Sequence, residues 1–142
     1  MRSAAVFDLD GTLCDDAHRK RFVTGDVKFY SMYYSLMDFD KPKPEVMKLL
    51  DMCRKQGLAI ILLTGRPEKY REITMQWLAR HSIHYDLLEM RCDSDFRKSD
   101  AMKREVLHKR LKPHYTVILA FDDSDTNIEM FRNNGVEAVR IA

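Results

Sequence analysis

The sequence predicts an α/β protein: a mostly parallel five-stranded sheet with helices on both faces, in a three-layer α/β/α, doubly wound arrangement. Two observations carry this prediction. Five short apolar runs alternate with amphipathic segments, and three of these runs end in polar residues. Strands that alternate with helices are joined by right-handed crossovers and lie parallel. A chain of 142 residues has the length of one domain, so we expect residues 1–142 to form a single unit.

The expected elements follow one another without long linkers. The first strand covers residues 3–9 and ends in acidic residues and Gly11. Residues 14–43 then form an insertion that is rich in aromatic residues and is predicted to be a small helical segment. The other elements alternate strictly: helix 44–56, strand 58–63, helix 68–82, strand 85–90, helix 99–111, strand 116–121, helix 125–134 and strand 136–141.

The composition is that of a folded globular protein, with 45% hydrophobic and 32% charged residues. The longest apolar run, 58–63, is far shorter than the roughly 20 residues of a membrane helix, so no membrane contact is expected. The first strand begins too early to leave room for a signal peptide, and we therefore expect a cytoplasmic protein. A net charge of +2 indicates no particular partner, and the three widely spaced cysteines are expected to be free thiols.

The strongest chemical signal is the run Asp8-Leu9-Asp10-Gly11-Thr12 at the end of the first strand. Residues two apart on an extended backbone point to the same side, so both carboxylates can reach one substrate. Gly11 permits the chain to turn sharply after them. Hydrolysis of a phosphate monoester requires a nucleophile, neutralisation of charge and a proton for the departing oxygen. Asp8 and Asp10 can supply the first and the last of these.

Two further strand ends carry polar residues that suit the same chemistry. Thr64-Gly65-Arg66 offers a hydroxyl, a main-chain amide and a guanidinium for binding phosphate oxygens. The pair Asp122-Asp123 adds hard oxygen ligands of the kind that Mg²⁺ prefers. Ligands of doubly wound sheets bind beyond the carboxyl ends of the strands, so these groups are expected to meet Asp8 there.

These elements resemble the motifs of the haloacid dehalogenase superfamily of phosphatases. The resemblance implies that Asp8 is the nucleophile and Asp10 the general acid and base, with Thr64, Gly65 and Arg66 binding substrate. It also implies a lysine beside the nucleophile. Lys103 is the first candidate for this lysine because of its position before Asp122, and Lys98 is the second candidate. The expected cofactor is Mg²⁺, held by Asp8, the carbonyl of Asp10 and Asp123. Two roles stay open for Asp122: it binds Mg²⁺ through a water molecule, or it holds the lysine.

A closer resemblance covers nearly the whole chain. The four motifs, including the run Arg97 to Lys103, are similar to those of the 3'-phosphatase domain of phage polynucleotide kinases. This implies a phosphomonoesterase that forms an aspartyl phosphate and removes the 3'-phosphate from a DNA or RNA end. No GxxxxGK[ST] loop occurs among the five glycines, so only a phosphatase domain is expected, and a separate kinase is a candidate partner.

Two other functions fit the same motifs. The first is a small nucleotidase or a metabolite phosphatase, and the second is a phosphate-binding or nucleic-acid-binding module that has lost catalysis. In the superfamily the position of residues 14–43 holds a cap over the active site, and here the segment is long enough only for a small one. Its tyrosines Tyr30, Tyr33 and Tyr34 either stack on a base or pack in the core.

Overall fold

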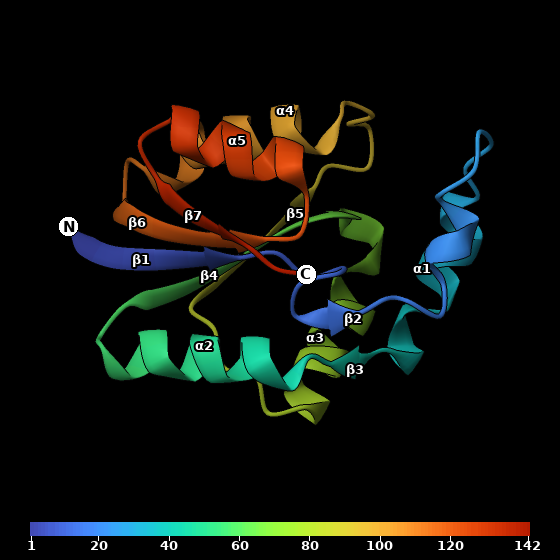
Figure 1. Ribbon diagram of the computed structural model, residues 1–142, viewed down its shortest axis with the longest axis horizontal. Coiled ribbons are helices and arrows are strands. Elements are labelled where there is room, and N and C mark those ends of the chain that lie inside the picture. Colours follow the sequence, from blue (N-terminus) through green and yellow to red (C-terminus); the bar gives the residue numbers. More distant parts are fainter.

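A computed structural model describes all 142 residues and has the predicted three layers (Figure 1). Five parallel strands form the central sheet in the order β5-β4-β1-β6-β7. The predicted fold class is therefore confirmed. The strands are β1 (Arg2–Phe7), β4 (Ala59–Pro67), β5 (Leu87–Arg91), β6 (Tyr115–Asp122) and β7 (Glu137–Arg140).

Four helices cover the two faces of the sheet, as Figure 1 shows. On one face α2 (Pro44–Lys55) and α3 (Arg71–Arg80) enclose a core that includes Phe7, Leu62 and Trp77. On the other face α4 (Ser99–Val106) and α5 (Asp125–Asn133) pack against the side chains that alternate with these along the strands. None of the helices has the length and apolar character that crossing a membrane requires.

The strand order places β1 between β4 and β6. All three strands run in the same direction, so their carboxyl ends lie together at one edge of the sheet. Phe7 pairs in register with Leu62 of β4 and with Phe121 of β6. This register brings the residues that follow β1 beside Thr64 and Asp122.

The insertion is only partly helical, which corrects the prediction of a helical segment. It leaves and re-enters the core through a two-stranded ribbon, β2 (Cys14–Asp15) and β3 (Lys41–Pro42). Between these strands lie a six-residue helix, α1 (Tyr30–Ser35), and two short 3-10 turns. Figure 1 shows this cap projecting from the carboxyl edge of the sheet. It has a small apolar centre of its own, formed by Tyr33, Tyr34 and Met37.

Several boundaries differ from the predicted ones, and two of the differences concern β4 and the segment that follows it. Strand β4 continues to Pro67 because Pro67 pairs with Arg91 of β5 beyond a register shift. The segment 68–82 starts as a 3-10 turn, and its α-helix ends at Arg80. In this extension the backbone stays extended at Thr64, Gly65 and Arg66, beyond Leu62, the last residue of β4 that pairs with β1.

Candidate active site

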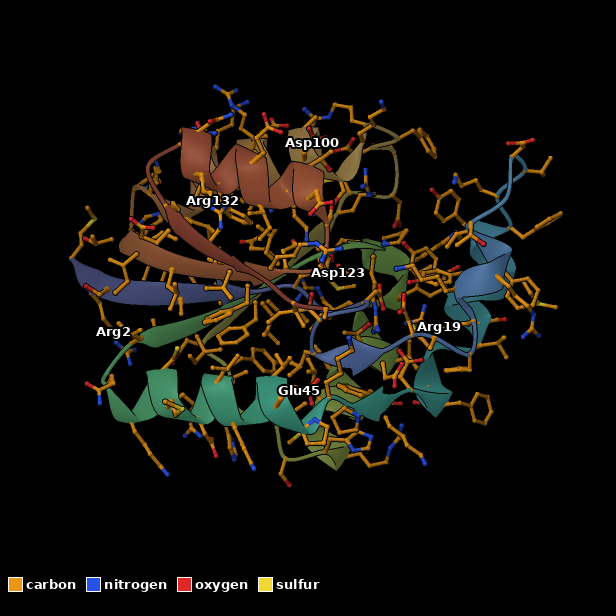
Figure 2. All side chains as sticks on the ribbon, viewed as in Figure 1. Arg2, Arg19, Glu45, Asp100, Asp123 and Arg132 are labelled. Carbon is orange, nitrogen blue, oxygen red and sulfur yellow. The ribbon has the colours of Figure 1, made fainter.

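The carboxyl ends of β1, β4 and β6 form the floor of a cleft of about 600 Å³, and the cap forms one wall. Asp8, Asp10, Gly65, Lys103 and Asp123 all line this cleft. Figure 2 shows Asp123 at the edge of the sheet that faces the cap, with Arg19 on the cap side. Five of the residues that the sequence predicts to act together therefore line one cleft.

Asp8 lies at the end of β1 with its carboxylate fixed by two partners. Its amide donates to the carbonyl of Phe121 at 3.0 Å, which continues the pairing of β1 with β6. One carboxylate oxygen accepts a hydrogen bond from Lys103 Nζ at 2.8 Å, and the other accepts one from Thr12 Oγ1 at 3.1 Å. Burial, together with the charges of Asp122 and Asp123, raises the pKa of Asp8 well above its usual range, although Lys103 acts in the opposite direction.

Lys103 comes from α4 and is only 1% exposed. Its ammonium group lies between two carboxylates, 2.8 Å from Asp8 and 2.7 Å from Asp122. Burial alone would lower the pKa of Lys103, but Asp122 and Asp8 outweigh it and raise that pKa above its usual range. Lys98 lies on the rim of the cleft without a carboxylate partner. Between the two candidates, the geometry favours Lys103 as the cation beside Asp8.

The adjacent acids Asp122 and Asp123 have different surroundings. Asp122 is buried, and both of its oxygens accept hydrogen bonds: one from the amide of Ser124 at 3.0 Å, the other from Lys103 and from Asn127 Nδ2 at 3.1 Å. Asp123 lines the cleft, and its one ion pair is a 3.6 Å contact with Lys20. Asp122 is thus engaged in holding Lys103, while Asp123 keeps oxygens available at the floor of the cleft.

Three observations fit a divalent cation at this position. Carboxylate oxygens of Asp8, Asp122 and Asp123 lie within 4.8 Å of one another. Only two cations contact these three carboxylates, Lys103 by hydrogen bonds and Lys20 in an ion pair of 3.6 Å with Asp123, so the negative charge is in excess. Asn127 also lines the cleft, and its Oδ1 is a buried oxygen without a partner. Hard oxygen donors with excess negative charge suit Mg²⁺.

Gly11 is required at this site because a side chain there would collide with Asp123. Its backbone has φ +83°, and an added Cβ would lie 2.1 Å from Asp123 Oδ2. Gly11→Ala is therefore expected to displace Asp123 and to weaken activation by Mg²⁺ about 10- to 100-fold, measured as turnover against metal concentration. Gly57 is a matched control, with φ +82° and nothing within 4 Å of an added Cβ. Gly57→Ala costs a similar backbone strain without altering metal activation. Equal metal dependence in the two variants would contradict the role of Asp123.

Asp10 is held by two buried arginines. Arg66 donates to Asp10 Oδ1 through Nη2 at 2.7 Å and through Nε at 3.1 Å, and Arg19 Nη2 donates to the same oxygen. Arg19 also donates to both oxygens of Asp40, at 2.9 and 2.6 Å. Burial alone would raise the pKa of Asp10, but Arg66 and Arg19 outweigh it and lower that pKa to about 2. Asp10 is therefore ionised, with a fixed orientation.

This arrangement gives Arg66 a structural role that the sequence did not predict. The guanidinium is 1% exposed and is not part of the cleft wall. Besides Asp10, it contacts Thr74 Oγ1 at 3.1 Å and Cys14 Sγ at 3.5 Å. These contacts orient Asp10, and the predicted contact between Arg66 and a substrate stays a prediction.

Thr64 and Gly65 occupy different depths. The amide of Arg66 donates to Thr64 Oγ1 at 3.1 Å, and the Thr64 side chain is fully buried. Gly65 lines the cleft, and its carbonyl accepts a hydrogen bond from Arg91 Nε at 2.9 Å. The main chain at Gly65 is thus placed to meet a substrate, whereas donation of a hydrogen bond by Thr64 to phosphate stays a prediction.

Several residues of the site carry no clear signal in the sequence. Arg19 reads as one member of the exposed basic run 18–21, and its burial depends on Asp10 and Asp40, which are distant in sequence. Thr12 lies in the run that starts at Asp8, but its contact with Asp8 was not predicted, and Asn127 was not predicted at all. Asn127 has a weak signal, since it follows Asp123 by one helical turn and its amide donates to Ser124 Oγ at 3.4 Å at the start of α5.

The doubly wound sheet, with acids at the ends of β1 and β6 and a buried lysine between them, defines a phosphatase of the haloacid dehalogenase type. Residues 2–142 match the family described as the polynucleotide kinase PNKP phosphatase domain, and the chain belongs to this family.

Similar solved structures agree with this assignment. A chain from the structure of the Pnkp1/Rnl/Hen1 RNA repair complex is 32% identical with a TM-score of 0.86, and the match covers 99% of this chain and 42% of that one. This chain therefore spans less than half the length of that relative. A hydrolase from Streptococcus pneumoniae is 17% identical with a TM-score of 0.65, covering 98% of this chain and 92% of that one. The class C acid phosphatase from Bacillus anthracis with tungstate bound is also 17% identical, with a TM-score of 0.64 and coverages of 89% and 53%. The last two likenesses concern the fold alone.

Proposed function

We propose that this chain is a Mg²⁺-dependent polynucleotide 3'-phosphatase that works through a phosphoryl group carried transiently on Asp8. The contact between Lys103 and Asp8 at the floor of the cleft is the observation that carries this proposal. A lysine fixed against the nucleophile offsets its charge, so that a second anion, the phosphate, can approach.

In the first step an oxygen of Asp8 attacks phosphorus, and the bond between phosphorus and the departing oxygen breaks. Asp10, ionised in the free protein, takes up the proton that the substrate brings as a phosphate monoanion and passes it to that oxygen. In the second step Asp10 accepts a proton from water, whose oxygen attacks phosphorus and releases Asp8. Its low pKa suits Asp10 to the second step, and the proton for the first step must arrive with the substrate as the phosphate monoanion. Arg19 and Arg66 keep the carboxylate oriented through both steps.

Asp8, Asp123 and the main-chain carbonyl of Asp10 are the groups that we propose hold Mg²⁺, with Asp122 held back to anchor Lys103. When bound, Mg²⁺ neutralises charge on the phosphate oxygens.

The family and the open cleft support a nucleic-acid end as the substrate. The 32% identical chain belongs to a structure named as an RNA repair complex, which favours RNA ends and also a partnership with other repair proteins. The small cap leaves the site accessible to a strand, since the cleft of about 600 Å³ is open between the cap and the segment before α4.

A substrate panel tests this function. RNA and DNA oligonucleotides with a 3'-phosphate, free nucleoside 3'- and 5'-monophosphates and an aryl phosphate are compared with Mg²⁺ and with EDTA. We expect kcat/KM at least about ten-fold higher for an oligonucleotide than for any free nucleotide, because a strand adds binding to bases and backbone. EDTA is expected to lower turnover at least about 100-fold. A preference for free nucleotides would indicate a nucleotidase, and no hydrolysis of any ester would indicate a binding module.

A further inference from the structure

Phe96 is a large apolar side chain left in solvent at the rim of the cleft. It is 91% exposed, more than any other large hydrophobic residue of the chain. It also belongs to the lining of the cleft that contains Asp8. Burying a phenylalanine side chain stabilises a protein by about 1.5–3 kcal/mol, so this position brings no benefit to folding. Its exposure suggests a role in contacting a ligand.

The loop that presents Phe96 is held firmly on both sides of this residue. Arg91 Nη1 donates to the carbonyl of Asp95 at 3.2 Å and to that of Arg97 at 2.6 Å. The carboxylate of Asp95 accepts hydrogen bonds from the amide and the side chain of Arg97, at 2.8–3.0 Å. The backbone that presents Phe96 is therefore preorganised, so binding a ligand there costs little entropy of loop ordering.

The same arginine fixes Phe96 relative to the reacting centre. Arg91 Nε donates to the carbonyl of Gly65 at 2.9 Å, and Gly65 lines the floor of the cleft beside Asp10 and Lys103. One guanidinium therefore connects the loop that carries Phe96 with the part of β4 predicted to bind the phosphate. A group bound at Phe96 lies at a set position from a phosphate bound at Gly65.

Across the cleft the cap presents aromatic rings. Tyr34 packs between Tyr30 and Tyr70, with ring centroids 6.2 and 5.0 Å away. Tyr33 is buried beneath them with its hydroxyl on Asp16 at 2.5 Å. Of the three tyrosines that could stack on a base, Tyr33 and Tyr34 are core residues, and Tyr30 is 53% exposed. Phe96 thus lines the same cleft as Tyr30, Tyr34 and Tyr70.

Cations on the rim suit an anionic strand. Lys69 and Lys98 both line the cleft, and neither forms an ion pair or a side-chain hydrogen bond with a carboxylate. Aromatic platforms beside free cations are the features that bind single-stranded nucleic acid. We infer that Phe96 is a stacking platform for the base of the 3'-terminal nucleotide. This inference rests on the proposed function.

The test compares two 3'-phosphorylated single-stranded oligonucleotides that differ only in whether the terminal nucleotide carries a base or is abasic. For the unmodified protein we expect KM about ten-fold lower with the base present. Phe96→Ala should remove this difference by raising KM for the base-containing substrate to the abasic value, with kcat unchanged. Phe96→Trp should restore the preference, and Phe96→Leu should not, since leucine offers apolar area without a ring face. Phe39→Ala is the matched control, because Phe39 is 74% exposed but lies outside the cleft.

The outcomes separate this inference from the proposed function. If Phe96→Ala keeps the preference for a terminal base, or if the unmodified protein has none, the stacking role is wrong while 3'-phosphatase activity stands. If no 3'-phosphorylated oligonucleotide is hydrolysed although aryl phosphate is, the proposed function itself fails. A similar loss of preference in Phe39→Ala would indicate a general effect of removing surface apolar area and would also overturn the inference.

Discussion

Replacing Asp8 by Asn is expected to lower kcat by about 10⁴-fold or more, because the amide cannot form the acyl phosphate on which both steps depend. The shape of the side chain is preserved, and Lys103 keeps its second partner, Asp122. The measurement is phosphate release under saturating substrate with Mg²⁺. Full turnover by this variant would show that another residue is the nucleophile.

The same substitution should leave the fold intact. The raised pKa of Asp8 means that its ionised form is disfavoured in the folded protein, so at neutral pH the charge opposes folding when no metal is bound. Without metal, the melting temperature of Asp8→Asn should therefore equal or exceed that of the unmodified protein. Asp93→Asn is a suitable control, since Asp93 lines the cleft but accepts a hydrogen bond from the amide of Lys69 and is not part of the acidic cluster. Its activity on aryl phosphate should be little changed.

Replacing Lys103 by Met is expected to affect both activity and stability. The substitution leaves Asp8 and Asp122 buried side by side without their shared cation, and breaking a buried ion pair in this way costs about 3–5 kcal/mol. Urea denaturation at neutral pH without metal measures this loss. Turnover should fall about 10²- to 10³-fold or more, because the charge that offsets Asp8 is gone.

Lys109→Met is the matched control for this prediction. Lys109 follows α4 on the same side of the sheet, is exposed, and pairs with Glu105 at 2.8 Å. Its replacement should change stability by no more than about 0.5 kcal/mol and leave turnover of aryl phosphate unchanged. If Lys103→Met were as mild as this control, Lys103 would not be the cation on which the site depends.

The sequence predicts the sheet well because each buried strand is a short apolar run between turn signals. The positions of Asp8, Asp10, Asp122 and Asp123 follow from this, since the ends of parallel strands share one edge. Lys103 could be selected over Lys98 by its spacing from Asp122, and the structure places its ammonium between Asp8 and Asp122.

The parts that were not predicted depend on contacts between residues far apart in the chain. Arg19 and Asp40 lie 21 residues apart in the sequence and come into contact only through the folding of the cap. Arg66 turns toward Asp10 because buried Thr74 and Cys14 supply its remaining partners, a choice that no local pattern encodes. The exposed position of Phe96 likewise depends on how Arg91 folds the loop, so periodicity could not reveal it.

The most direct test of the account asks whether Asp8 carries the phosphoryl group. In Asp10→Asn the second step should stall for lack of a base, whereas an aryl phosphate with a good leaving group needs no acid in the first step. After an acid quench, mass mapping of peptides from this variant is expected to show one added phosphoryl group on Asp8, and none in Asp8→Asn/Asp10→Asn. Hydrolysis without any phosphorylated protein, or a phosphoryl group on a different residue, would contradict the account.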